Sequence, residues 1–300
     1  MSSKLLVSII LLIVVSLGGC KPNTRERAEV LTVTIEPQKY FLEKIVGNHY
    51  KVKAIIPAGS NPESADFTPS QMRDLSNSII YFKIGYLGIE NVLTDKMATE
   101  KPDLKIIDCS DGIMPVGDAH VHCNDETHDH KDEHQHGHIG GDPHTWSSVK
   151  SAKTIVENMY KALLETDNKN EADYTKNYNE LIREINETDS IIRSYLDQSD
   201  SKAFIIYHPA LSYFADEYGL MQYSIEYEGK NPSPSQLKEL IDKAKAEKIK
   251  VVFIQEEFDT KNAETVAKEI GGKTIPINLL SYYWNEELIK IAKAITLGEI

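Results

Sequence analysis

The apolar residues of this chain fall into short runs that alternate with longer stretches of helical spacing. Eight runs, four before residue 110 and four after residue 200, are predicted to be strands: 30–35, 52–56, 79–84, 104–107, 203–207, 222–225, 251–254 and 273–277. Helical patterns lie between them, at 38–47, 69–76, 89–98, 210–218, 235–247, 260–270 and 286–294. Because the strands are apolar at nearly every residue, they are expected to form parallel sheets covered on both faces.

Two longer helical patterns, 148–165 and 171–198, separate the two groups of strands. The pattern predicts an α/β fold of two lobes, each a mostly parallel sheet flanked by helices, joined by a long linker helix at 148–170. The N-terminal lobe is expected at 30–147 and the C-terminal lobe at 171–300. In such an architecture a ligand binds in the cleft at the carboxyl ends of the strands.

The first nineteen residues have the features of an export signal. Lys4 precedes an apolar run at 5–17, which is shorter than the ~20 residues of a transmembrane helix. The ending Leu-Gly-Gly-Cys resembles the bacterial lipobox, which implies cleavage before Cys20 and a lipid on its thiol. An ordinary secretion signal with an incidental cysteine is the alternative. Residues 20–29 then form a polar tether, and the chain is expected outside the cytoplasm, anchored to the cell membrane.

The formal net charge of −13 at pH 7 argues against a nucleic-acid partner and favours the attraction of cations. The mature chain, about 270 residues, is long enough for two lobes with their own cores, and a monomer is expected. Cys109 and Cys123 could form a disulfide in an oxidising compartment. Alternatively, Cys123 is a soft metal ligand. The disulfide is the favoured interpretation, and the sequence leaves both open.

Histidine is concentrated in one acidic segment, and imidazole is a ligand for zinc, copper and nickel. Of the ten histidines in the chain, seven lie in this segment: His120, His122, His128, His130, His134, His136 and His138. A tract of this polarity cannot bury a core, so residues 118–140 are expected to form a mobile loop. The composition predicts metal contact, and a solvated polar linker is the alternative.

Three segments lie where a ligand in the cleft would bind. Glu63 and Asp66 lie in the turn-rich stretch 56–71, His144 follows Asp-Pro at the start of a helix, and His208 follows a strand. A single histidine after a strand is more often a capping or core residue. Three such loops, from both α/β units and the crossover between them, favour a shared binding site.

These segments carry motifs of one protein family. Residues 59–70 read GSNPESADFTPS where the family has G-x-x-P-H-x-[YF]-E-P-T-P-S. Residues 142–146 read DPHTW, like D-P-H-x-W, and residues 208–220 read HPALSYFADEYGL, like H-x-A-[FY]-x-Y-F-x-x-x-[YF]-G-L. Over essentially the whole mature chain, the sequence resembles the solute-binding lipoproteins of zinc and manganese ABC transporters (cluster A-I). A histidine-rich loop just before D-P-H is a mark of the zinc branch.

The resemblance implies that Glu63, His144 and His208 bind the metal. Two departures bear on this site: Glu63 stands where the family has histidine, and Asn278 stands where many members have aspartate. The fourth position would be held by water, Asp66 or a loop histidine, with Asn278 and Glu256 as further candidates. Two imidazoles and a carboxylate form an acceptable tetrahedral zinc set. Carboxylates also suit Mn²⁺, and the histidine loop favours zinc. A degenerate site that binds no metal is the alternative.

The implied function is the carriage of zinc in the inter-lobe cleft and its delivery to an ABC permease and its ATPase. The alternatives are a surface zinc store or adhesin, a manganese carrier, and a zinc hydrolase. A hydrolase is disfavoured because the ligands do not lie on an H-E-x-x-H helix and no motif places a general base. Glu256 and Glu257 follow a strand and are the carboxylates available for that role.

Overall fold

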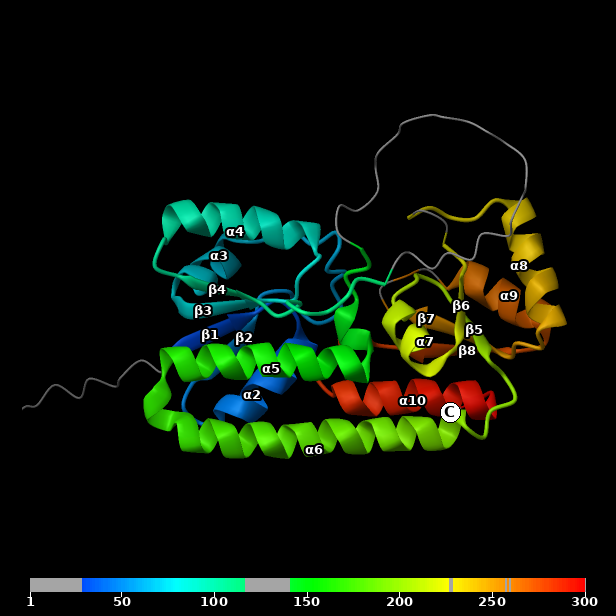
Figure 1. Cartoon of the computed structure of the whole chain (residues 1–300). Coiled ribbons are helices and arrows are strands. Elements are labelled where there is room, and N and C mark those ends of the chain that lie inside the picture. Colours follow the sequence, from blue (N-terminus) through cyan, green and yellow to red (C-terminus); the bar gives the residue numbers. More distant parts are fainter. Residues whose placement is uncertain (1–28, 117–140, 227–228, 257, 259, 300) are drawn as a thin grey trace, which may run out of the picture.

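The computed structural model describes residues 29–116, 141–226, 229–256, 258 and 260–299. Within them the chain forms two four-stranded sheets in which every pair of neighbouring strands is parallel, flanked by helices (Figure 1). This confirms the predicted fold class. The predicted strands and helices are all present, with bounds that differ by no more than three residues.

The N-terminal sheet has the order β2-β1-β3-β4 and consists of β1 (Val30–Val33), β2 (Lys51–Ala54), β3 (Ser78–Lys83) and β4 (Lys105–Asp108). Its helices are α2 (Glu36–Val46), α3 (Pro69–Ser76) and α4 (Gly88–Glu100). Figure 1 shows α3 and α4 on one side of the sheet and α2 on the other.

The C-terminal sheet repeats this topology with the order β6-β5-β7-β8. Its strands are β5 (Ala203–Ile206), β6 (Met221–Ser224), β7 (Val251–Gln255) and β8 (Lys273–Ile277). Its helices are α7 (Ser212–Tyr218), α8 (Pro234–Ala246), α9 (Lys261–Ile270) and α10 (Trp284–Leu297). The helix that follows the second strand begins with a capping box in each lobe, Thr68-Pro-Ser-Gln71 for α3 and Ser233-Pro-Ser-Gln236 for α8.

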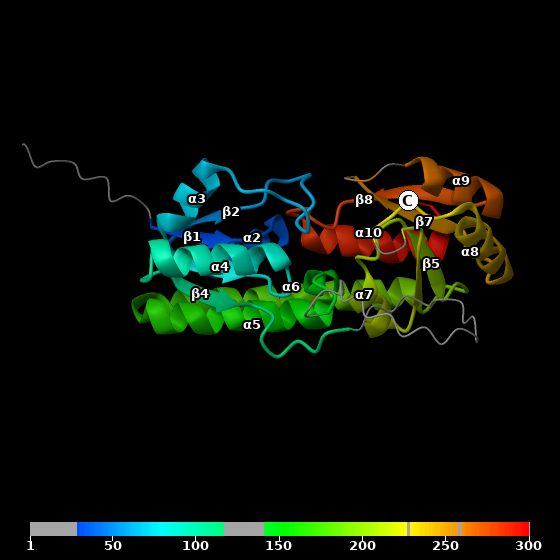
Figure 2. The same cartoon turned by 90° about the horizontal axis from the view of Figure 1, so that it is seen from above.

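Two helices connect the lobes, α5 (Val149–Thr166) and α6 (Glu171–Leu196), with the short turns η1 (Thr145–Ser147) and η2 (Asn168–Asn170) before them. The linker helix was expected at 148–170, which is the position of α5. That helix packs against β4 and α2 of the N-terminal lobe and also contacts α7 of the C-terminal lobe, while α6 contacts both α2 and α10 and passes below both lobes (Figures 1 and 2). Both helices therefore contact both lobes, and α6 is the longer of the two.

A pair of buried tryptophans lies at the junction of the lobes. The Trp146 indole N–H donates to the Leu279 carbonyl at 2.8 Å, and the Trp284 indole N–H donates to the Trp146 carbonyl at 2.6 Å. The Trp284 ring also packs edge-on against Phe41 of α2, with 5.0 Å between ring centroids. The largest hydrophobic cluster extends through both lobes, so the junction is part of a continuous core. Among the described residues, no helix is long and apolar enough to cross a membrane.

Replacing Trp284 by Phe is expected to lower the free energy of unfolding by about 2–4 kcal/mol, because the Trp146 carbonyl loses a buried donor and the smaller ring leaves a void. Urea denaturation of the metal-free protein measures this change. The neighbouring Tyr283 is 60% exposed, so Tyr283→Phe is the matched control and should leave stability nearly unchanged. Equal stability of the two variants would contradict the role of the Trp284 indole.

Candidate metal centre

Three side chains from separate loops meet at the lobe junction: Glu63, His144 and His208. Their candidate ligand atoms all lie within 4.8 Å of one another, and no other such group of three occurs in the described part of the chain. The Glu63 carboxylate lies between the two rings, with Oε1 3.7 Å from His144 Nε2 and Oε2 3.6 Å from His208 Nε2. The two imidazole centroids are 5.2 Å apart.

These separations suit a tetrahedral metal. Bonds of ~2.0–2.2 Å to a central zinc place neighbouring ligand atoms about 3.4 Å apart. The observed 3.7 Å from Oε1 of Glu63 to His144 and 3.6 Å from Oε2 of Glu63 to His208 are close to that value. The arrangement can therefore hold a divalent cation through two imidazole nitrogens and one carboxylate oxygen, which leaves the fourth position to another donor.

Glu63 lies in the loop between β2 and α3. The Asn61 side chain accepts the Glu63 N–H at 2.8 Å and shapes the turn. At the end of the loop, Gln71 closes the capping box with Thr68 and donates its side-chain N–H to the Ile55 carbonyl at 2.7 Å. Both ends of the loop are thereby anchored, while the Glu63 side chain is 21% exposed.

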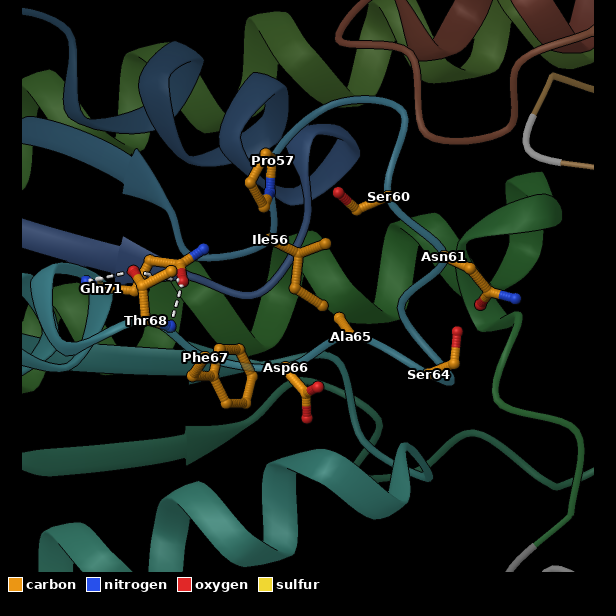
Figure 3. Close-up of a pocket in the computed structure, with 10 residues that line it drawn as sticks. All are labelled: Ile56, Pro57, Ser60, Asn61, Ser64, Ala65, Asp66, Phe67, Thr68 and Gln71. Carbon is orange, nitrogen blue, oxygen red and sulfur yellow. Dashed lines mark hydrogen bonds between the residues drawn. The ribbon is translucent and has the colours of Figure 1, made fainter.

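A small cavity of about 280 Å³ lies inside this loop. Its lining combines apolar and polar side chains, and Asp66 is one of them (Figure 3). Asp66 is exposed and is not part of the three-residue group. Of the two candidate carboxylates in this loop, Glu63 lies beside the two histidines and Asp66 is outside the group.

His144 is held by the aspartate two residues before it. Asp142 Oδ1 accepts the backbone N–H of His144 at 2.8 Å and lies 2.7 Å from Nδ1 of the ring. Because a carboxylate accepts, Nδ1 carries the proton and Nε2 is left to face Glu63. Burial by itself raises the pKa of the Asp142 carboxyl, but the charge and hydrogen bonds of His144 outweigh it and hold that pKa below its ordinary value. The Tyr213 hydroxyl donates to the Asp142 carbonyl at 2.8 Å and links this turn to the C-terminal lobe.

His208 follows β5 and is held from three sides. Its Nδ1 lies 3.1 Å from Glu226 Oε2. Its backbone is paired with the side chain of Gln255, which accepts the His208 N–H at 3.2 Å and donates to the His208 carbonyl at 2.6 Å. The Phe258 ring stacks on the imidazole with 5.2 Å between centroids. Burial lowers the pKa of His208, but hydrogen bonds and charge from Glu226 and Glu63 outweigh it and raise the pKa to about 10.

Two further candidates from the sequence, Asn278 and Glu256, contact each other. Asn278 Nδ2 donates to Glu256 Oε2 at 3.1 Å, and Asn278 Oδ1 accepts the Leu280 N–H at 3.0 Å. Its amide is therefore engaged within its own loop and with Glu256, which is exposed.

Several predicted sites lie outside the described residues. They are Cys20, Cys123 and the seven histidines of the loop, His120, His122, His128, His130, His134, His136 and His138. Cys109 is buried, and burial raises the pKa of its thiol. Its pairing with Cys123 stays a prediction.

Asp142 and Glu226 were not predicted to be the carboxylates that hold the histidines. Asp142 lies in the D-P-H motif, so its proximity to His144 was a usable signal. Glu226 lies seven residues before a Ser-Pro-Ser-Gln tetrad, and Glu63 lies five residues before Thr-Pro-Ser-Gln. That internal similarity was the signal for a second carboxylate-bearing loop.

Comparison with known proteins gives consistent matches over most of the chain. A family model described as zinc-uptake complex component A, periplasmic, matches residues 31–287. The high-affinity zinc uptake system protein ZnuA of Bacillus subtilis is 29% identical over 91% of this chain and 84% of its own length. The zinc-binding lipoprotein AdcA of Streptococcus pneumoniae is 26% identical over 95% of this chain, which spans only 56% of that longer protein.

A solved crystal structure also matches this chain over most of its length. The crystal structure of a 138-173 deletion mutant of ZnuA with zinc bound superimposes with a TM-score of 0.79 and 32% sequence identity. The match covers 91% of this chain and 98% of that structure.

Replacing His208 by Ala is expected to weaken zinc binding by on the order of 100-fold or more, beyond the effect of residues that only support a ligand. The fold should persist, because the ring faces the metal group. Competition with a zinc chelator measures the affinity, and thermal unfolding without metal tests the fold. His49 pairs with Asp173 on the surface, so His49→Ala is the matched control. Unchanged affinity in the His208 variant would exclude His208 as a ligand.

Zinc binding is expected to strengthen as the pH rises. Because the pKa of His208 is about 10 in the metal-free protein, its imidazole carries an extra proton at neutral pH, and zinc must displace that proton to bind. Protonation of His208 alone should then lower the apparent zinc affinity about tenfold for each pH unit of acidification. Chelator competition between pH 6 and pH 8 tests the slope. An affinity independent of pH would contradict displacement of a proton by the metal.

Proposed function

Because this chain belongs to the zinc-uptake complex component A family, we propose that it is the solute-binding protein of an ABC importer. It binds one zinc ion in the cleft between its lobes and delivers the ion to a membrane permease that works with an ATPase. The observation that carries this proposal is the meeting of Glu63, His144 and His208 at separations that suit tetrahedral zinc.

The origin of the three side chains supports a site between the lobes. Glu63 comes from the β2–α3 loop of the N-terminal lobe, His144 precedes η1 at the crossover, and His208 follows β5 of the C-terminal lobe. A cation bound to all three contacts both lobes, as expected of a carrier that encloses its cargo. The family consists of solute-binding proteins of zinc uptake and not of enzymes, so the hydrolase interpretation has no support.

The proposed location is outside the cytoplasm. The family is described as periplasmic, and the relative from Streptococcus pneumoniae is named a lipoprotein. Together with the Leu-Gly-Gly-Cys sequence at the end of the signal, these support an anchor through a lipid on Cys20. A lipid anchor keeps the loaded carrier near the permease, which raises its effective concentration there.

Zinc is the proposed cargo because the relatives are named for zinc and two of the three candidate ligands are imidazoles. In this proposal the histidine-rich segment 118–140 collects metal ions at low affinity. The cleft, whose ligands are already in place, then holds one ion tightly. A surface zinc store would need only the histidine-rich segment, so the two functions predict different consequences of removing it.

Deleting residues 120–138 is expected to remove weakly bound metal and to leave one tightly bound zinc per chain. Native mass spectrometry of untagged protein counts the ions. In cells that lack the wild-type chain, uptake of radioactive zinc at limiting concentration should be restored by the deletion variant but not by His208→Ala. Loss of the tight ion on deletion would show that a loop histidine belongs to the site. Full uptake with His208→Ala would refute carriage in the cleft.

A further inference from the structure

The two lobes contribute one carboxylate each from corresponding loops. Glu63 lies between the second strand of its sheet and a helix capped by Thr68 and Gln71. Glu226 lies between the second strand of the other sheet and a helix capped by Ser233 and Gln236. The loops occupy the same place in the shared strand order, β2-β1-β3-β4 and β6-β5-β7-β8.

These two carboxylates face opposite nitrogens of one ring. Glu63 Oε2 is 3.6 Å from His208 Nε2, and Glu226 Oε2 is 3.1 Å from His208 Nδ1. The Glu226 side chain is 11% exposed and His208 is 13% exposed, so water competes little for the contact. Only the Nε2 side faces the candidate metal group. Glu226 is therefore placed to act on the ring and not on the ion.

The register of β5 and β6 brings Glu226 to this position. Ile206 pairs with Ser224, and the Glu226 N–H continues the ladder by donating to the Tyr207 carbonyl at 3.0 Å. His208 lies two residues after Ile206 and Glu226 lies two residues after Ser224. The register of the strands therefore places Glu226 beside His208. The pairing matters because the segment 206–213 contains no acidic residue that could hold the ring locally. His144 differs, since Asp142 of its own turn holds its Nδ1.

We propose that Glu226 is a positioning residue of the zinc site: it accepts a hydrogen bond from His208 Nδ1 and so fixes the ring with Nε2 toward the metal. Phe258 limits rotation of the same ring by stacking on it. This inference rests on the proposed function, because it assigns Glu226 a part in zinc affinity. A carboxylate that holds a ligating imidazole also makes the ring a better donor, and loss of such a partner typically costs 10–100-fold in metal affinity.

The test compares Glu226→Ala with Glu226→Gln, which keeps an oxygen that can accept the Nδ1 hydrogen bond. The matched control is Glu247→Gln, because Glu247 is an exposed carboxylate that also bonds a β6 residue, Tyr223, at 2.7 Å. Zinc affinity is measured by chelator competition. The visible absorption spectrum of the Co²⁺ form reports the ligand geometry, and thermal unfolding without metal reports the fold.

Glu226→Ala should lower zinc affinity about 10–100-fold and change the Co²⁺ spectrum, at an unfolding temperature close to that of the wild type. Glu226→Gln should recover most of the affinity and the spectrum, and Glu247→Gln should behave as wild type. Wild-type affinity and spectrum in Glu226→Ala would overturn the inference. Equal losses in the Ala and Gln variants with a lowered unfolding temperature would also overturn it, because they indicate a packing role. A wild-type protein that binds no zinc would instead refute the proposed function itself.

Discussion

The fixed distance between the two lobes is the constraint on which the candidate metal centre depends. Glu63 and His208 belong to different lobes, so their 3.6 Å separation persists only while the lobes keep their positions. Two buried indole N–H groups, of Trp146 and Trp284, tie the crossover to the first residue of α10 and to the loop before that helix, and α6 packs on both α2 and α10. Each indole needs a buried acceptor, and these bonds satisfy both. The ring of His144 lies 5.1 Å from that of Trp146, so the junction and the metal centre are neighbours.

Within that frame, each imidazole is oriented before a metal arrives. A carboxylate holds Nδ1 of each ring, which leaves the two Nε2 atoms facing the same carboxylate, Glu63. Ligands that are already ordered lose less conformational entropy on binding than ligands recruited from a polar segment. This difference gives a physical basis for the proposed contrast between one tight site at Glu63, His144 and His208 and weaker metal contacts elsewhere.

The features that could be predicted from the sequence are those that neighbouring residues encode. The strands could be read from apolar runs such as 79–84, and the loops bearing Glu63, His144 and His208 from short motifs. The way the two helices join the lobes could not, because 148–165 and 171–198 are both amphipathic and periodicity does not show that each of them contacts both lobes. Glu226 was missed because its contact with His208 depends on the pairing of β5 with β6, a long-range feature that periodicity does not encode. Asn278 is a candidate through the family resemblance, and the sequence does not show that its amide bonds Glu256 and the backbone of Leu280.

The three candidate ligands differ in the exposed fraction of their side chains. The most exposed of them marks the side of the site that faces solvent. The side chains of His144, His208 and Glu63 are 7%, 13% and 21% exposed, respectively. The histidines are buried against aromatic rings, whereas Glu63 lies on a loop that surrounds a cavity. A cation therefore meets two rigid nitrogens on the protein side and a more accessible carboxylate on the solvent side.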